Sequence, residues 1–219
     1  CLLLLHSIAS AGLFDDWRIK MPMRMAGYAQ DGMLTNFPVL VTLSTNITGF
    51  LYSDFLSGTN ADLRFSDSNG TVELNYEVEK WNTNGTSYVW VQMPALGSAE
   101  DYVWAYWGKS GQSIPVYTTN GATWSNGYIA VWHMQETSPL DSTSNAYHTT
   151  GTSLAVTNGV SGSALYFNGT SSKAAVPAAF GPTGGKFSFE MWGKTASATT
   201  DRRAFESYLA SPARRMIIR

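Results

Sequence analysis

Three glutamates lie close together in one segment, with a spacing that could gather carboxylates for catalysis. Glu73, Glu77 and Glu79 occupy positions i, i+4 and i+6 of residues 72–81 (VELNYEVEKW), which alternate between apolar and polar side chains. In an extended strand these side chains share one face, and a retaining glycosidase needs two carboxyl groups about 5–5.5 Å apart. The Glu-x-Asp-x-x-Glu pattern of jelly-roll glucanases is absent from the sequence. We therefore interpret the glutamates as a solvated strand face or as partners of Arg64.

Other catalytic arrangements are also missing from the sequence. The three histidines, His6, His133 and His148, do not occur in the His-x-His or His-Glu-x-x-His spacing of zinc sites. Cys1 is the single cysteine, and no Gly-x-Ser-x-Gly segment marks a nucleophilic serine. We predict that the chain is not an enzyme.

Aromatic residues are the best candidates for ligand binding. If residues 88–93 (YVWVQM) and 101–107 (DYVWAYW) pair antiparallel with Trp90 opposite Trp104, the aromatic side chains gather on one face. That face carries five aromatic residues: Tyr88, Trp90, Tyr102, Trp104 and Tyr106. The opposite face carries apolar residues that are sufficient for a core: Val89, Val91, Met93, Val103, Ala105 and Trp107. The aromatic face is either a stacking platform for sugar rings or a surface that packs against a second sheet or a neighbouring domain.

The composition restricts the classes of partner. Charged residues make up 14% of the 219 residues, whereas about 25% is typical of soluble domains, and the formal net charge is -2. No basic run is present, so we expect no nucleic-acid partner. No apolar stretch reaches the roughly 20 residues of a membrane span.

The beginning of the sequence resembles the end of a secretory signal peptide. An apolar run (LLLLHSI) is followed by Ala9-Ser10-Ala11, which has small residues where signal peptidase requires them. We interpret residues 1–11 as a signal-peptide remnant that is cleaved after Ala11. The mature chain is then expected to be secreted, periplasmic or exposed at the cell surface.

The candidate residues must be positioned by strands. Alternating or continuous apolar patterns predict strands near residues 17–25, 37–43, 62–66, 72–81, 88–93 and 101–107. Asn69-Gly70 and Asn84-Gly85 predict tight turns. We expect an all-β chain, with an antiparallel β-sandwich over residues 13–110. A Gly-, Ser-, Thr- and Asn-rich linker would follow at 111–126, and a second, incomplete β domain at 127–219.

The first domain resembles the bacterial family DUF2341, a domain without an assigned activity. The resemblance covers residues 14 to about 108. It rests on six segments: Trp17-Arg18, FPVLV at 37–41, DLRFSD at 62–67, YEVEKW at 76–81, VWVQMP at 89–94 and YWG at 106–108.

The second domain looks like the first part of a laminin-G-like, concanavalin A-like jelly roll. The matching segments are AVWHM at 130–134, DSTSN at 141–145, GSALYFNG at 162–169 and FSFEMW at 187–192. Such jelly rolls often hold one Ca²⁺, and the resemblance implies that Asp141 and Asn145 supply oxygen ligands. The alternative is an Asx-turn, in which the same side chains cap their own backbone.

Three functions remain open at this point. The first is an exported, non-catalytic module that binds carbohydrate or a cell-surface protein, which the jelly-roll resemblance implies only by analogy of fold. The second is a structural domain of a larger envelope protein, because the resemblance includes proteins with a MotA/TolQ/ExbB-type proton channel. The third is a set of accessory domains of a glycoside hydrolase.

Overall fold

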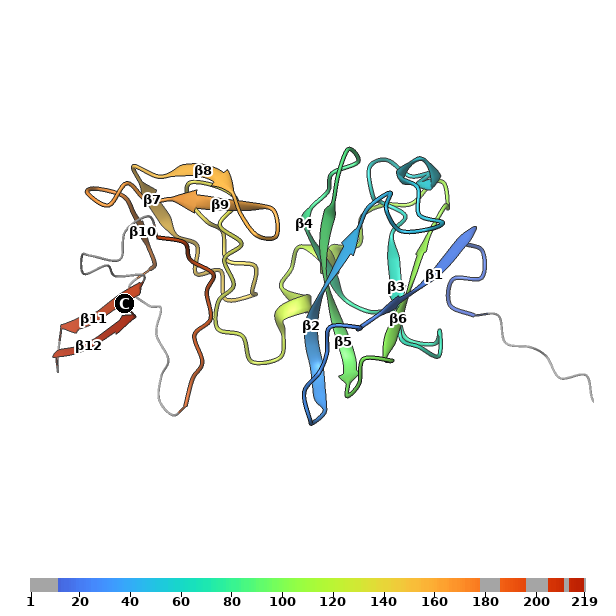
Figure 1. The fold of residues 1–219 in the computed structure, drawn as a ribbon, viewed down its shortest axis with the longest axis horizontal. Coiled ribbons are helices and arrows are strands. Elements are labelled where there is room, and N and C mark those ends of the chain that lie inside the picture. Colours follow the sequence, from blue (N-terminus) through green and yellow to red (C-terminus); the bar gives the residue numbers. More distant parts are fainter. Residues whose placement is uncertain (1–11, 178–185, 196–204, 211–212, 219) are drawn as a thin grey trace, which may run out of the picture. The chain divides into compact units, whose positions relative to one another are not determined.

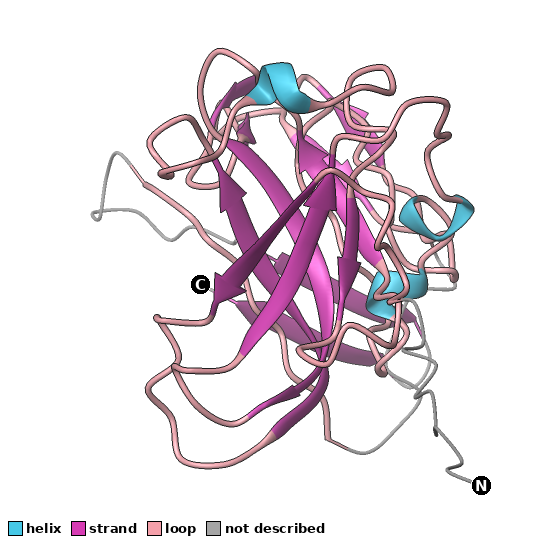
Figure 2. Cartoon of the chain, turned by 90° about the vertical axis from the view of Figure 1, so that its right-hand side faces the viewer, coloured by secondary structure: helices cyan, strands magenta, loops and turns pink. Residues whose placement is uncertain are grey.

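The computed structural model describes residues 12–177, 186–195, 205–210 and 213–218 of the chain. The proposed signal-peptide remnant, residues 1–11, lies outside the described residues. The described chain is all-β and antiparallel, and its helical elements are three short 3-10 turns (Figure 2). No described helix has the length and hydropathy needed to cross a bilayer. The predicted fold class is confirmed at the level of an all-β, sandwich-like protein.

Two three-stranded sheets build the first part of the chain (Figure 1). One sheet has the order β1-β6-β3 and the other the order β2-β5-β4. Their strands are β1 (Ile19–Arg24), β2 (Leu34–Leu43), β3 (Arg64–Ser66), β4 (Tyr76–Lys80), β5 (Ser87–Leu96) and β6 (Tyr102–Trp107). Each of them overlaps a segment that the sequence pattern predicts to be a strand.

The core lies where the inner faces of the two sheets meet. The aliphatic side of β5 and the corresponding side of β6 are buried there, as the alternation predicts. Phe50, Leu63 and Phe65 fill the same core. Phe55 stacks on Trp107 with ring centroids 5.8 Å apart. This packing leaves the alternate residues of β5 and β6 on the two outer faces of the sandwich.

The pairing of residues 88–93 with 101–107 is wrong. β5 pairs with β2 and β4, whereas β6 pairs with β1 and β3, so the two segments belong to different sheets. The connection at residues 97–101 carries the chain from one sheet to the other. It is held by the Asp101 carboxylate, which accepts hydrogen bonds from the backbone N–H groups of Gly97 and Ser98 at 2.7 and 2.8 Å. The aromatic residues are therefore divided between opposite faces.

Residues 111–126 pack on the sandwich as part of its structure. They contain the 3-10 turns η2 (Val116–Thr118) and η3 (Ala122–Trp124), whose neighbours are β4 and β5. Thr123 and Trp124 are buried. The predicted linker therefore differs from the observed boundary between compact units, which falls after Ala175.

The rest of the first unit contains four short strands in two pairs. β8 (Ala155–Asn158) pairs with β9 (Ser163–Tyr166), and β10 (Lys173–Ala175) pairs with β7 (Thr150–Thr152). In the second unit, residues 176–219, β11 (Phe205–Ala210) pairs with β12 (Ala213–Ile218). The described strands after residue 149 thus form two-stranded sheets, and the jelly roll expected over 127–219 stays a prediction.

Candidate functional site

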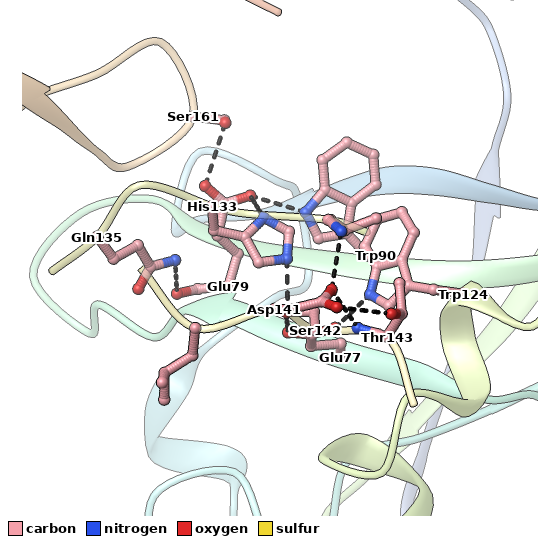
Figure 3. Close-up of polar contacts among 12 residues, drawn as sticks. Glu77, Glu79, Trp90, Trp124, His133, Gln135, Asp141, Ser142, Thr143 and Ser161 are labelled. Atoms are coloured by element: carbon pink, nitrogen blue, oxygen red, sulfur yellow. Dashed lines mark hydrogen bonds and ion pairs between the residues drawn. The ribbon is translucent and has the colours of Figure 1, made fainter. Parts of the chain in front are cut away.

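Two carboxylates face the same imidazole on the outer face of the β2-β5-β4 sheet. Glu77 and Glu79 lie on β4, where the register with β5 shifts between Val78 and Lys80 and leaves Glu79 as the extra residue of a bulge. His133 Nε2 lies 3.4 Å from Glu77 Oε1, and His133 Nδ1 lies 3.6 Å from Glu79 Oε2 (Figure 3). These are ion-pair distances without hydrogen-bond geometry at Nε2.

The three side chains are largely removed from solvent. The exposed fraction of the side chain is 13% for His133, 18% for Glu77 and 3% for Glu79. Carboxylates at such sites need nearby donors, because an unpaired buried charge is costly. The expectation that Glu77 and Glu79 share a face is confirmed, whereas their interpretation as a solvated face is wrong.

Each carboxylate accepts further hydrogen bonds from side chains distant in sequence. Trp90 Nε1 donates to Glu79 Oε2 at 2.7 Å, and Ser161 Oγ donates to Glu79 Oε1 at 3.2 Å. Ser142 Oγ donates to Glu77 Oε1 at 2.7 Å, and Trp124 Nε1 donates to Glu77 Oε2.

These contacts set the pKa of Glu77. Burial, the largest influence, raises the pKa of the Glu77 carboxyl group. The His133 imidazole 3.4 Å away, together with the hydrogen bonds from Ser142 and Trp124, outweighs burial and holds the pKa of Glu77 below its ordinary value. The cluster is thus arranged to keep Glu77 ionised.

Aromatic rings enclose the imidazole. Trp90 lies 6.1 Å from His133 between ring centroids at an interplanar angle of 25°, and Trp124 lies 5.6 Å from it. The two indoles contact each other at 5.3 Å, and Tyr128 packs edge-on against Trp124 at the same centroid distance. Trp90 is therefore committed to packing against residues 124–133.

A cavity of about 320 Å³ adjoins this cluster. Its lining comprises Glu77, Val78, Glu79, Thr118, Thr119, His133, Met134, Gln135, Glu136, Pro139, Leu140, Asp141, Ser142 and His148. Several of these polar groups already bond within the chain: the Leu140 N–H donates to Glu136, and the Asp141 N–H donates to His148 Nδ1. The described residues hold no group of three or more His, Cys, Asp or Glu side chains arranged for a metal ion. The arrangement fastens residues 124–142 to the sheet.

Glu73 occupies a separate place. It lies before β4 and forms an isolated bridge with Ser66. Its carboxylate lies 3.6 Å from Arg64 Nε and accepts a hydrogen bond from the Tyr117 hydroxyl. Burial, followed by this hydrogen bond, raises the pKa of Tyr117 well above its ordinary range. The suggested pairing with Arg64 is therefore found at Glu73, and the three glutamates do not form one group.

The other half of the predicted aromatic platform lies on the β1-β6-β3 sheet. Tyr102 and Trp104 are half-buried on its outer face, with their rings edge to face at 5.3 Å. Tyr106 is buried, and its hydroxyl lies 3.0 Å from Ser66 Oγ. Tyr88 remains with Trp90 on the other sheet, so the five predicted residues form no single surface.

Asp141 and Asn145 do lie in one loop, but their polar groups bond to the chain itself. Asp141 is buried; its Oδ1 accepts the N–H groups of Val131 and Thr143, and its Oδ2 accepts the Thr143 hydroxyl and the Tyr147 N–H, all at 2.9 Å. The Asn145 side-chain amide donates to the Ile129 carbonyl oxygen at 2.9 Å. This is the Asx-type arrangement, and it occupies both carboxylate oxygens that a calcium ion would need.

Sequence reasoning missed Trp124, Ser142 and Ser161 as partners of the two glutamates. One signal was available for Trp124, because a tryptophan is unusual in a Gly- and Ser-rich linker and indicates a packed segment. Nothing in the sequence marks the two serines among the many others.

Comparison with known families finds one match. The model of a family described as "Domain of unknown function (DUF2341)" matches residues 59–145. No curated protein and no solved structure matches the chain. The matched range includes β4, β5, η3, His133 and Asp141, and it runs across the predicted linker. The family match therefore covers the segment 111–142, which packs on the sandwich, together with β3 to β6.

Proposed function

We propose that this chain is an exported, non-catalytic module that binds carbohydrate on the outer face of the β1-β6-β3 sheet. The observation that carries the proposal is the pair Tyr102 and Trp104, which keeps partial exposure there beside exposed Pro22. Partly exposed Tyr and Trp side chains combine a flat apolar ring with a polar tip, which suits contact with a sugar ring. Trp90 is not part of this face, because Trp124 and His133 cover it. Tyr88 is not part of it either, because it lies on β5 in the other sheet.

The contacts of the glutamates favour a structural role over a catalytic one. Glu77 and Glu79 contact a shared histidine, and each accepts further hydrogen bonds from tryptophan and serine. Carboxylates whose oxygens already accept hydrogen bonds in this way stabilise the packing of residues 124–142 on the β2-β5-β4 sheet. A proton donor or nucleophile would instead need an oxygen directed at a substrate.

The test is binding of the full chain to a panel of polysaccharides, measured by affinity electrophoresis and calorimetry. We expect Trp104→Ala to weaken binding at least about tenfold, since stacking contacts of this kind are hot spots. Tyr166→Ala is the matched control, because Tyr166 is exposed and lies on β9. Unchanged affinity in Trp104→Ala would refute the proposed face, and failure to bind any polysaccharide would refute the function.

A structural role in a larger envelope protein is the second candidate. It is favoured by the cluster around His133, which joins the sandwich to the chain that follows. In that case the full chain would bind no polysaccharide, yet disruption of the cluster would still destabilise it.

A further inference from the structure

We infer that the carbohydrate taken by the β1-β6-β3 face is acidic, carrying carboxylate or sulfate groups that pair with Lys20 and Arg24. This inference rests on the proposed function and names the ligand class for the same face. It comes from the positions of two cations relative to the aromatic pair.

The register of β1 and β6 places the cations on both sides of Trp104. Pro22 is opposite Trp104, Lys20 is opposite Tyr106, and Arg24 is opposite Tyr102. Lys20, Pro22 and Arg24 are the exposed residues of β1, on the face away from the core. Because a strand rises about 3.4 Å per residue, the two cationic positions lie about 14 Å apart along β1. An extended oligosaccharide across Trp104 would pass both cations.

Lys20 is available for an anionic ligand. Its Nζ lies 4.1 Å from the centroid of the Trp104 ring and 5.4 Å from that of Tyr106. Among the described residues, no ion pair within 4.0 Å is found for this ammonium group. The contact with two rings holds the charge beside the aromatic surface without neutralising it.

Arg24 is held at the surface by Glu100, whose backbone carbonyl oxygen also accepts a hydrogen bond from Nη1 at 3.2 Å. Its guanidinium lies 5.6 Å from the Tyr102 ring, and Nη1 lies 3.2 Å from the Glu100 carboxylate. The side chains of Arg24 and Glu100 are 55% and 86% exposed, so this ion pair is screened by water and salt. A ligand anion can therefore compete with Glu100 for the guanidinium.

The neighbouring aspartates direct their oxygens at their own turns and keep their negative charge. The Asp67 carboxylate accepts the backbone N–H groups of Thr71 and Val72, and Asp101 caps its own turn. In the described part of the chain, Glu100 is the carboxylate that contacts these cations. The charged groups that contact the Trp104 and Tyr102 rings are thus positive, which favours an anionic ligand at the rings, although the whole chain carries a formal charge of -2.

The experiment compares pairs of polymers that differ in charge. The full chain is titrated at low salt with polygalacturonate and its fully methyl-esterified form, and with dextran sulfate and dextran. We expect tighter binding to the charged member of at least one pair, with affinity falling as salt is added. The two pairs distinguish carboxylate from sulfate recognition.

Charge variants connect this preference to the two residues. Lys20→Gln and Arg24→Gln should each weaken binding of the acidic polymer about three- to tenfold, and Lys20→Arg should retain it. Glu100→Gln should strengthen binding about two- to threefold, because it removes the negative charge that competes with the ligand for Arg24. Lys173→Gln, an exposed site on β10, is the control and should change nothing.

The outcomes distinguish a failure of the acidic preference from a failure of carbohydrate binding itself. Equal binding of charged and neutral polymers, still lost in Trp104→Ala, would overturn the inference and leave carbohydrate binding intact. Binding of inorganic polyphosphate as tight as that of the acidic polysaccharide would show attraction to charge alone and would also overturn it. If no polysaccharide binds, both fail.

Discussion

Replacing Trp90 by phenylalanine keeps most of the ring packing on the β2-β5-β4 sheet while removing the indole N–H that Glu79 accepts at 2.7 Å. The Glu79 side chain is 3% exposed, so water cannot readily take the place of the lost donor. A hydrogen bond to a charged group contributes about 1.5–3 kcal/mol. We therefore expect Trp90→Phe to lower the free energy of unfolding by about 2 kcal/mol. Trp90→Ala should cost about 3–5 kcal/mol, because it also removes the packing against Trp124 and His133.

The measurement is urea unfolding of the full chain, followed by far-ultraviolet circular dichroism. Trp104→Phe is the matched control, since its indole N–H donates at 2.9 Å to the exposed backbone oxygen of Ser68, which water can solvate. That substitution should cost about 1 kcal/mol or less. In a double-mutant cycle, Trp90→Phe and Glu79→Gln should show a coupling energy of about 1 kcal/mol or more. A loss below about 0.5 kcal/mol for Trp90→Phe, or a coupling energy of zero, would show that the Trp90–Glu79 hydrogen bond does not stabilise the fold.

Three further predictions concern the acid stability, a glycine contact and the beginning of the mature chain. The pKa of Glu77 is lower in the folded protein than its ordinary value of 4.5, so its contribution to stability is complete above that pH and is lost as pH falls through the folded-state pKa. Unfolding curves between pH 5 and 2 should therefore show a steeper loss of stability for the wild type than for Glu77→Gln, and equal slopes would contradict the assignment. Gly121 has φ +86°, and an added Cβ would collide with the backbone of Ser144, whereas at Gly111, φ +73°, it would meet nothing within 4 Å. Gly121→Ala should accordingly destabilise by about 1–3 kcal/mol more than Gly111→Ala in the same assay, and similar losses would show that the 143–144 backbone moves freely. Expressed behind a complete signal sequence, the exported chain should begin at Gly12 by N-terminal sequencing, and retention of residues 1–11 would argue against cleavage.

Several local features could be predicted from sequence because they depend on neighbours along the chain. Period-two alternation in residues 88–93 and 101–107 identifies the buried sides of β5 and β6, because successive side chains of a strand point to opposite faces. The same rule places Glu77 and Glu79 together. Asn84-Gly85 marks the turn that joins β4 to β5, with the Gly85 N–H donating to the Asn82 carbonyl oxygen. These features follow from backbone geometry and side-chain type.

The partners of the strands were decided only by the tertiary structure. Alternation determines which residues of β5 share a face, but it contains no information about which strand forms hydrogen bonds along each edge. The five residues between β5 and β6 suit a hairpin equally well, and the structure uses them to cross between sheets. This crossing separates Trp90 from Trp104 and places them on opposite outer faces.

The environment of the two glutamates likewise depended on the tertiary structure. The sequence by itself determined that Glu77 and Glu79 share the outer face of one strand, and an outer face is ordinarily solvated. Whether a later segment covers that face depends on packing between residues far apart in the chain. Here the fold brings Trp124 and His133 onto the sheet, so that indole and imidazole groups replace water around both carboxylates. The physical reason is that local patterns set the direction of a side chain, whereas its burial and its pKa depend on every group that the fold brings within contact distance.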